Sequence, residues 1–542
     1  MDNVHIMQFD KMQSSLEIIK TINDNSEVKK MEYRSSDEVK ASSSFVLSLL
    51  LGLQAITVLL LPLVYVAKNL MDLLCILPDD PVRIQVVSLM IMVTGISTLL
   101  FNTFEKRLHV LFSPSVRYYK IVSNSLSLHR ACPGSGDLFA MGFTKRSFEW
   151  KSRMNTVQSG LIFTHLLTAL AGLTGLCRVI DSVLSNDLVL IPATFAVGIS
   201  QVEDLFALRT YASNESLESS NSVVVIVIMT IIPLVIASFK FGAVKFRVPS
   251  YSLKEGLGTR EYKLFQLFAI FISPFYSVFF YPGLCALIYG LKSYESGHPF
   301  PEQDDAGSHF LLHMPFKFGW PKLDYGMMIN LLPDVFINTV TSIIIFRVTC
   351  FTCGEKTLTK TVTNGVLGES LINLILAGFG LSSNVSAFNI GLGKLTGIMH
   401  QRMLQLCGLS LLLIAIHPPT LLALSKTSVF HLQAIHFITS MLVSVTGLSM
   451  IQGMRHLSNR DFTVIGSSIF SSFFLPNIIL TSGSSLLFPV LLKLLSSSVV
   501  VAIFTAVIAD RILEGRKADD ENDGQHRNNH LSFSEELFSL CF

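Results

Sequence analysis

The segment Phe388 to Gly397 is short, polar and broken by glycine, and it separates two long apolar runs. It contains Asn389, Gly391 and Thr396 in the pattern Asn-x-Gly-x4-Thr. In hydrocarbon, an interrupted backbone is tolerated only where protein buries it or where it lines a cavity. Broken helices at membrane depth are also the means by which secondary transporters build a solute site. The segment therefore predicts a solute pathway in a polytopic membrane protein.

The composition of the whole chain agrees with this class. Of the 542 residues, 50% are hydrophobic and only 15% are charged, whereas a soluble domain is usually about one quarter charged. The net charge is only +2, so the chain lacks the excess of positive charge that is typical of proteins that bind a nucleic acid polymer. The sequence has no dinucleotide loop, P-loop, metal-ligand cluster or hydrolase constellation, so we expect no enzyme. We also expect no cofactor beyond a coupling ion, Na⁺ or H⁺.

Apolar runs of spanning or near-spanning length recur along the chain and flank the broken segment. Two shorter, more polar pieces near 110–122 and 385–398 each follow a pair of ordinary spans, at similar places in the two halves. Paired broken segments of this kind indicate an inverted repeat with a central site. Counting both gives about 14 crossings, which places both termini on one side. The ordinary runs lie near 43–66, 84–101, 156–177, 187–205, 222–240, 265–291, 327–350, 366–382, 403–418, 430–451, 463–477 and 486–510.

The distribution of lysine and arginine predicts that the side with both termini is cytoplasmic. The loop 240–263 carries six of these cations, and Arg347 is also predicted to lie in a cytoplasmic loop. The loop 123–154 disagrees, because it is basic yet falls on the outside. With no signal peptide at the start, the first apolar run both targets and spans. We therefore expect a multi-pass protein of the plasma membrane with cytoplasmic tails at 1–42 and 513–542.

Two features of the predicted outer loops concern covalent chemistry. Asn214 begins an Asn-x-Ser sequon in a short outer loop, so we expect glycosylation there. Asn384 begins the same pattern but lies at membrane depth. Cys75 and Cys132 both fall in outer loops, where a disulfide and two separate thiols are the alternatives. The Cys-x-x-Cys pair at 350 and 353 lacks a second pair of ligands and is interpreted as incidental.

The order of several motifs resembles the nucleobase–ascorbate transporters, whose animal members include the sodium-dependent vitamin C transporters. The family signature is Gln, Glu or Pro, then Asn-x-Gly-x4-Thr, then Arg, Lys or Gly. The segment from Asn389 to Gly397 fits it, with Phe388 at the variable first position. Further similar motifs, in the family's order, are Gly52-Leu53-Gln54, Trp150 with Arg153-Met154 and Val157 to Gly160, Phe318 to Pro321, and Ser458 to Arg460.

The resemblance implies an all-α membrane fold in residues 43–512, built as a 7+7 inverted repeat. It divides this region into a core domain, about 43–177 and 327–418, and a gate domain, about 187–291 and 430–512. Short strands in the third and tenth segments would cross near the middle of the membrane, where the substrate binds. The expected partners are a small-molecule substrate, the lipid bilayer, and a second copy of the chain through the gate domain.

The chain also departs from the family at the expected substrate site. The eighth span of the family carries a Glu that bonds the substrate, and the alignment places Thr341 there, with Ile345 one turn later. Phe388 replaces a polar residue or proline. The candidate substrate-binding residues are Gln54, Arg117, Thr341, Ile345, Phe388, Asn389, Gly391 and Thr396.

Each candidate has a structural alternative. Gln54 and Asn389 are also suited to bonding the backbone of the broken segments, Ile345 and Phe388 to packing a collapsed pocket, and Arg117 to the cytoplasmic interface. The leading functional hypothesis is a secondary active transporter of a nucleobase or an ascorbate-like solute. The alternative is a divergent, non-transporting or anion-binding membrane protein of the same fold.

Overall fold

The structure, a computed structural model, describes residues 45–514 except for most of 115–141, 213–230, 273–313, 483–488 and several shorter gaps. Arg117, Asn214, the predicted N-terminal tail and all but two residues of the predicted C-terminal tail lie outside the described residues, as do most of the predicted spans 222–240 and 265–291.

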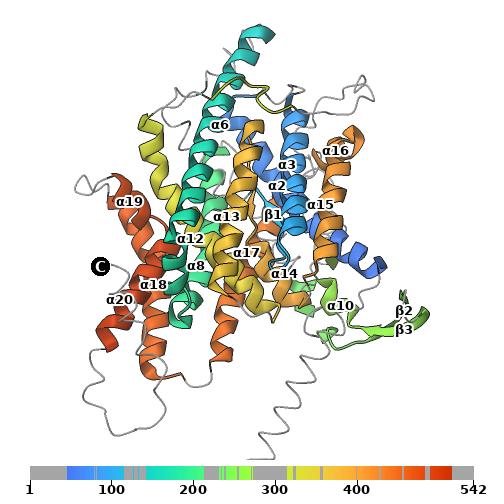
Figure 1. The fold of residues 1–542 in the computed structure, drawn as a ribbon, viewed down its shortest axis with the longest axis vertical. Coiled ribbons are helices and arrows are strands. Elements are labelled where there is room, and N and C mark those ends of the chain that lie inside the picture. Colours follow the sequence, from blue (N-terminus) through green and yellow to red (C-terminus); the bar gives the residue numbers. More distant parts are fainter. Residues whose placement is uncertain are drawn as a thin grey trace, which may run out of the picture.

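The described part is a bundle of long helices (Figure 1). Because the apolar runs carry few charges or helix breakers, their backbone groups are satisfied inside each helix. Six described helices are long and apolar enough to cross a membrane, or seven if the bent pair α7 and α8 forms one span. The first-half helices are α2 (Phe45–Leu73), α3 (Val82–Phe104), α6 (Phe143–Thr174), α7 (Leu176–Val183) and α8 (Asp187–Ala212).

The remaining helices follow a short strand hairpin. They are α10 (Leu264–Leu267), α12 (Tyr325–Thr352), α13 (Thr359–Leu376), η2 (Ala377–Phe379), α14 (Phe388–Thr396), α15 (Gln401–Ala415), α16 (Pro418–Ser425), α17 (Val429–Met450), η3 (Ile451–Gly453), α18 (Asn459–Ser482), α19 (Pro489–Leu495) and α20 (Ser498–Glu514).

Three sequence predictions about the helices need correction. Helix α6 begins at Phe143, so part of the basic loop predicted at 123–154 is helical. Arg347 lies inside α12 rather than in a loop, and its guanidinium pairs with buried Asp181 of α7, with an Nη2–Oδ2 distance of 2.8 Å. The run 486–510 forms two helices, α19 and α20. The count of 14 segments stays a prediction, since two of the runs fall largely outside the described residues.

Two very short strands lie between the long helices, as the resemblance implied. Strand β1 (Phe112–Ser113) pairs antiparallel with β4 (Asn384–Val385), with Phe112 opposite Val385. Figure 1 shows β1 inside the bundle, among α2, α3 and α13. The two broken segments thus meet, although the paired residues Ser113 and Asn384 are 271 positions apart in the sequence.

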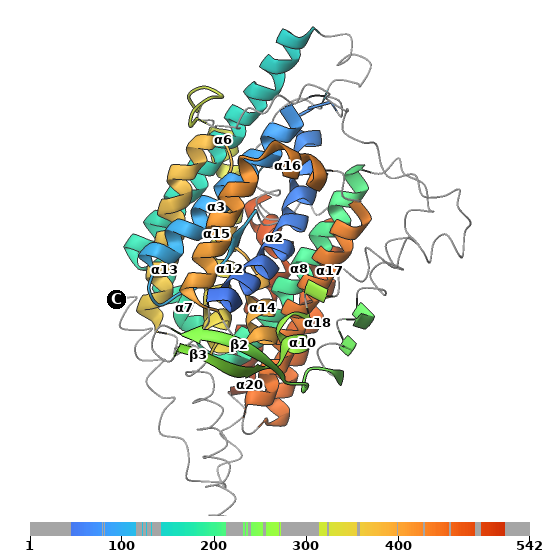
Figure 2. The ribbon, with the colours of Figure 1, turned by 90° about the vertical axis from the view of Figure 1, so that its right-hand side faces the viewer.

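A second two-stranded sheet was missed by the all-α prediction. Strands β2 (Phe246–Ser252) and β3 (Gly256–Tyr262) form an antiparallel hairpin with seven residue pairs. Figure 1 and Figure 2 show this hairpin near the end of the bundle where α10 and α14 lie, while α16 lies at the other end.

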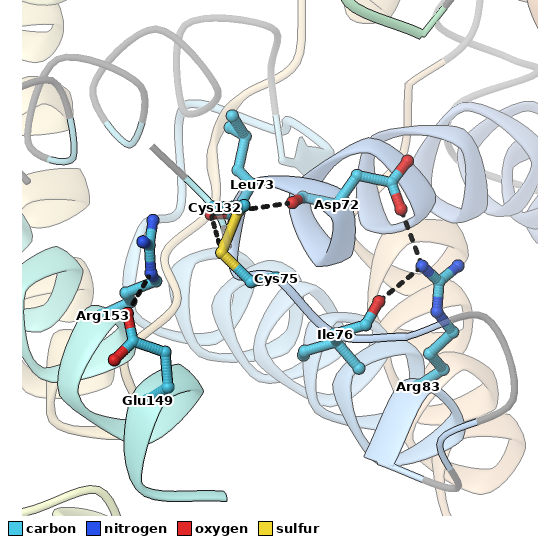
Figure 3. The surroundings of a disulfide bond; sticks show 8 residues. All are labelled: Asp72, Leu73, Cys75, Ile76, Arg83, Cys132, Glu149 and Arg153. Atoms are coloured by element: carbon cyan, nitrogen blue, oxygen red, sulfur yellow. Dashed lines mark hydrogen bonds and ion pairs between the residues drawn. A yellow bond between two sulfur atoms is a disulfide. The ribbon is translucent and has the colours of Figure 1, made fainter. Parts of the chain in front are cut away.

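A disulfide joins the end of α2 to the long segment before α6. Cys75 and Cys132 are bonded, with their Cα atoms 5.6 Å apart (Figure 3). Beside the bridge, Arg83 donates to the Asp72 carboxylate at 2.7 Å and to the Ile76 carbonyl at 2.8 Å, which fixes the turn between α2 and α3. Of the two alternatives that the sequence left open, the structure shows the disulfide, and Cys350 and Cys353 are not joined in a disulfide.

Helices α8 and α17 approach each other through glycine. A Cβ atom on Gly198 of α8 would lie 2.6 Å from the carbonyl oxygen of Ser440 and 2.7 Å from the amide nitrogen of Ser444, both on α17. Small residues at a helix interface let the two backbones pack closely, which is the main source of attraction between helices in a bilayer.

We expect Gly198→Ala to lower the stability of the protein by about 1–3 kcal/mol, because the backbone of α17 must move. Gly466→Ala on α18 is the matched control, since a Cβ there meets nothing within 4 Å. Thermal unfolding of the purified protein in detergent measures both. Equal unfolding midpoints for the two variants would show that the close contact between α8 and α17 is wrong.

Candidate functional site

Asn389 is the residue that holds the two broken segments together. Its side chain is fully buried at the start of α14. Its Oδ1 accepts a hydrogen bond from the Leu111 amide at 2.8 Å, and its Nδ2 donates to the carbonyls of Leu111 at 2.9 Å and Ser386 at 2.7 Å. The amide thereby acts like one more strand residue beside β1. These contacts favour the structural alternative, in which Asn389 orders the break.

Other buried side chains satisfy the rest of the crossing backbone. The Phe112 amide donates to Thr98 Oγ1 on α3 at 3.2 Å. The Val385 amide donates to Glu369 Oε1 on α13 at 3.0 Å. Strands of two residues cannot satisfy their own amides and carbonyls, and no water is available in hydrocarbon to do so. The surrounding helices must therefore supply polar groups at this depth.

Glu369 is a functional candidate that the sequence analysis missed. It lies in the apolar run of α13, is buried, and reaches the strand crossing through Oε1. A carboxylate inside a spanning helix is costly and marks a solute or ion pathway by default. The signal was present in the sequence as a lone acidic residue between Gly368 and Ser370.

Helix α12 presents one polar face to this crossing. Asn338 Oδ1 accepts a hydrogen bond from the Asn384 side chain on β4 at 3.0 Å. Thr341, three residues later on the same face, is fully buried and donates to the Ile337 carbonyl at 2.9 Å. Ile345 follows at the next turn and is packed in an apolar cluster. The face expected to carry the family's carboxylate therefore carries an amide, a hydroxyl and an aliphatic group.

Helix α14 packs directly on α17. The Phe388 ring lies 5.7 Å from the His436 ring, nearly perpendicular to it. A Cβ on Gly391 would lie 3.1 Å from Cβ of Leu442. Thr396 is half-buried near the far end of α14 and donates to the Leu392 carbonyl at 2.7 Å. Gly391 thus permits the close approach of α14 to α17, and Thr396 stabilises the end of the short helix.

Gln54 on α2 differs from these satisfied groups. Its side chain is 1% exposed, and neither its oxygen nor its nitrogen has a hydrogen-bond partner among the described residues. Leu51 and Val58, which flank it on the same helix face, belong to the apolar cluster that also contains Phe388. A buried polar group left unsatisfied costs about 1–3 kcal/mol. Gln54 therefore places an amide in an apolar environment, and both ends of this amide are able to form further hydrogen bonds.

The structure brings most of the predicted residues into two neighbouring sets. Phe388, Asn389 and Gly391 lie on α14, and Thr341 and Ile345 on α12, which packs against α14. Gln54 lies on α2, which packs against α17 as α14 does. Within the described ranges, no group of three or more metal-binding side chains occurs.

Comparisons with known proteins agree with the motif order. The sequence model described as a permease family (Xan_ur_permease) matches residues 47–481. The chain is 24% identical over 491 residues to Solute carrier family 23 member 2 of Homo sapiens, covering 86% of this chain and 73% of that protein. It is 22% identical over 520 residues to Solute carrier family 23 member 1 of Mus musculus, covering 92% and 84%.

Among solved structures, the chain is similar to SLC26A9, with a TM-score of 0.45 and 12% identity over 88% of this chain. It spans 66% of the length of that chain.

We expect Asn389→Leu to lower the thermal unfolding midpoint strongly. The change leaves the buried amide of Leu111 without its acceptor, at a cost of about 1–3 kcal/mol, while the Leu111 carbonyl still accepts from the Ser386 amide at 2.9 Å. Asn477→Leu on the exposed face of α18 is the control and should leave the midpoint nearly unchanged. An Asn389→Leu protein as stable as the wild type would mean that this amide does not hold the crossing.

Proposed function

The chain belongs to the xanthine/uracil permease family, and we propose that it is a secondary active transporter of a small polar organic solute of the nucleobase or ascorbate type. In this proposal the solute binds beside the crossing of β1 and β4. The core and gate domains move against each other around it, with Na⁺ or H⁺ as the coupling ion. The protein acts in the plasma membrane, with both termini in the cytoplasm.

The unsatisfied Gln54 amide carries this proposal. A primary amide offers two donors and an acceptor on one plane. Nucleobases and ascorbate present donors and acceptors of the same kind on a flat ring. A solute that pairs with Gln54 would remove the cost of burying it, which favours binding.

The polar groups nearest the crossing narrow the chemistry of the solute. Asn389 uses its amide on the protein backbone, and the hydroxyl proton of Thr341 is used by the Ile337 carbonyl. Thr341 is therefore left with oxygen lone pairs as an acceptor for a solute donor. A hydroxyl oxygen is a weaker acceptor than the carboxylate that the family carries at this position. We therefore expect weaker binding of solutes rich in N–H donors than the family pattern implies.

A second candidate function rests on the apolar substitutions. Phe388 packs against His436, and Ile345 is buried in an apolar cluster, so both fill space at positions that the family uses for substrate. This packing favours a non-transporting member of the same fold. Uptake of radiolabelled ascorbate, uracil, xanthine and urate, with and without Na⁺, separates the two candidates. Accumulation of one of these solutes supports transport, and accumulation of none supports the alternative.

We expect Gln54→Leu to reduce solute affinity about ten- to a hundred-fold, the effect of losing a hydrogen bond of about 1–3 kcal/mol. The same change should not lower the unfolding midpoint, because it removes an unsatisfied polar group. Gln158→Leu on α6 is the contrasting variant, since its Nε2 donates to the Gly378 carbonyl at 3.0 Å. It should lower the midpoint. Normal uptake by Gln54→Leu would show that the amide does not contact the solute.

The close contact between α14 and α17 can be tested by enlarging the side chain at position 391 in steps. We expect Gly391→Ala to reduce uptake and Gly391→Leu to abolish it, since the larger side chain meets Leu442 and displaces α14. Gly466→Leu, which enters open space, is the control for adding the same side chain. Cell-surface labelling checks that each variant reaches the membrane. Uptake unaffected by Gly391→Leu would place the solute pathway elsewhere.

A further inference from the structure

We propose that the base of the β2–β3 hairpin is a binding surface for anionic phospholipid headgroups. We define this surface, the hairpin base, as residues 240–247 and 261–265. It lies between two apolar runs of the sequence, 222–240 and 265–291. A segment that leaves one apolar run and returns to the next begins and ends at the membrane–water boundary.

The hairpin base exposes apolar and aromatic side chains. Phe241, Val244 and Phe246 are 42%, 40% and 37% exposed. The rings of Phe241 and Phe246 both pack on the Phe265 ring, with centroids 5.4 Å and 5.5 Å away. Aromatic groups on the surface of a segment at the boundary are typical of protein that inserts among lipid headgroups.

Cations alternate with these apolar side chains along the chain. Lys240, Lys245, Arg247 and Lys263 are all exposed. Within the described part of the hairpin base, Glu261 is the acidic residue that faces them, 3.7 Å from Lys245 and 3.2 Å from Arg247. One carboxylate is thus shared between two cations, and positive charge remains in excess.

The pairing of the strands fixes this arrangement. Arg247 lies opposite Glu261 and Phe246 opposite Tyr262, so the charged and aromatic pairs occupy adjacent rungs of the ladder. Successive residues of a strand point to opposite faces, which separates the two kinds of side chain. When the aromatic face lies toward the acyl chains, the cations of the other face lie at the level of the lipid headgroups. Clusters of cations next to a membrane segment bind anionic lipid with about a five-fold gain in affinity per cation.

Native mass spectrometry of the full-length protein in detergent tests this surface, with phosphatidylserine and phosphatidylcholine as the two probes. We expect tighter binding of phosphatidylserine. The double variant Lys245→Gln/Arg247→Gln should weaken that binding by roughly 25-fold, the product of two five-fold losses, and leave phosphatidylcholine unchanged. Lys145→Gln/Lys317→Gln removes two exposed cations elsewhere and should have little effect.

If the neutralised hairpin proves unstable, Lys245→Arg/Arg247→Lys keeps the charge and must keep the preference for phosphatidylserine. Equal affinity for the two lipids, or an equal loss in the Lys145/Lys317 control, would overturn the proposal. So would chemical crosslinks from Lys245 to the acidic segment 519–523 without a lipid preference, because the tail of the chain would then be the occupant.

Discussion

The need to satisfy a short piece of irregular backbone between apolar helices governs this structure. Strands β1 and β4 contain two residues each and give each other only a few hydrogen bonds. In a bilayer, each unsatisfied amide or carbonyl costs several kcal/mol, so such strands persist only where side chains complete their bonding. The side chain of Asn389 does so from one half of the chain to Leu111 in the other, 278 residues away. It therefore links the two halves at the point where the solute is proposed to bind.

This requirement explains the unusual polarity of the spanning helices. Thr98 on α3 and Glu369 on α13 are buried because the strand amides need acceptors there. The crossing in turn brings α14 against α17, where glycine at position 391 allows close contact. Gln54 stands apart, since it is buried but serves no backbone group among the residues described. Asn389, whose amide bonds the backbone, therefore belongs to the residues that build the site, whereas Gln54 is the residue proposed to bind the solute.

The sequence predicted the crossing better than its details. The two broken segments predicted interrupted backbone at membrane depth, and the resemblance to the family implied short strands there. They could not show whether Asn389 serves the backbone or the solute, since one amide suits both. Glu369 was overlooked because a single acid hardly changes the hydropathy of a long run. The β2–β3 hairpin was missed because Pro249 and the glycines at 256 and 258 weaken its strand pattern.

Hydrogen–deuterium exchange of the wild-type protein in lipid nanodiscs tests the central claim, that the solute binds at the strand crossing. The measurement compares the protein with and without whichever of ascorbate, uracil, xanthine and urate it transports. We expect the solute to slow exchange in residues 108–113 and 383–396, and to leave the hairpin at 246–262 unchanged. A transported solute that leaves both crossing segments unprotected, or that protects only a distant segment, would contradict the account.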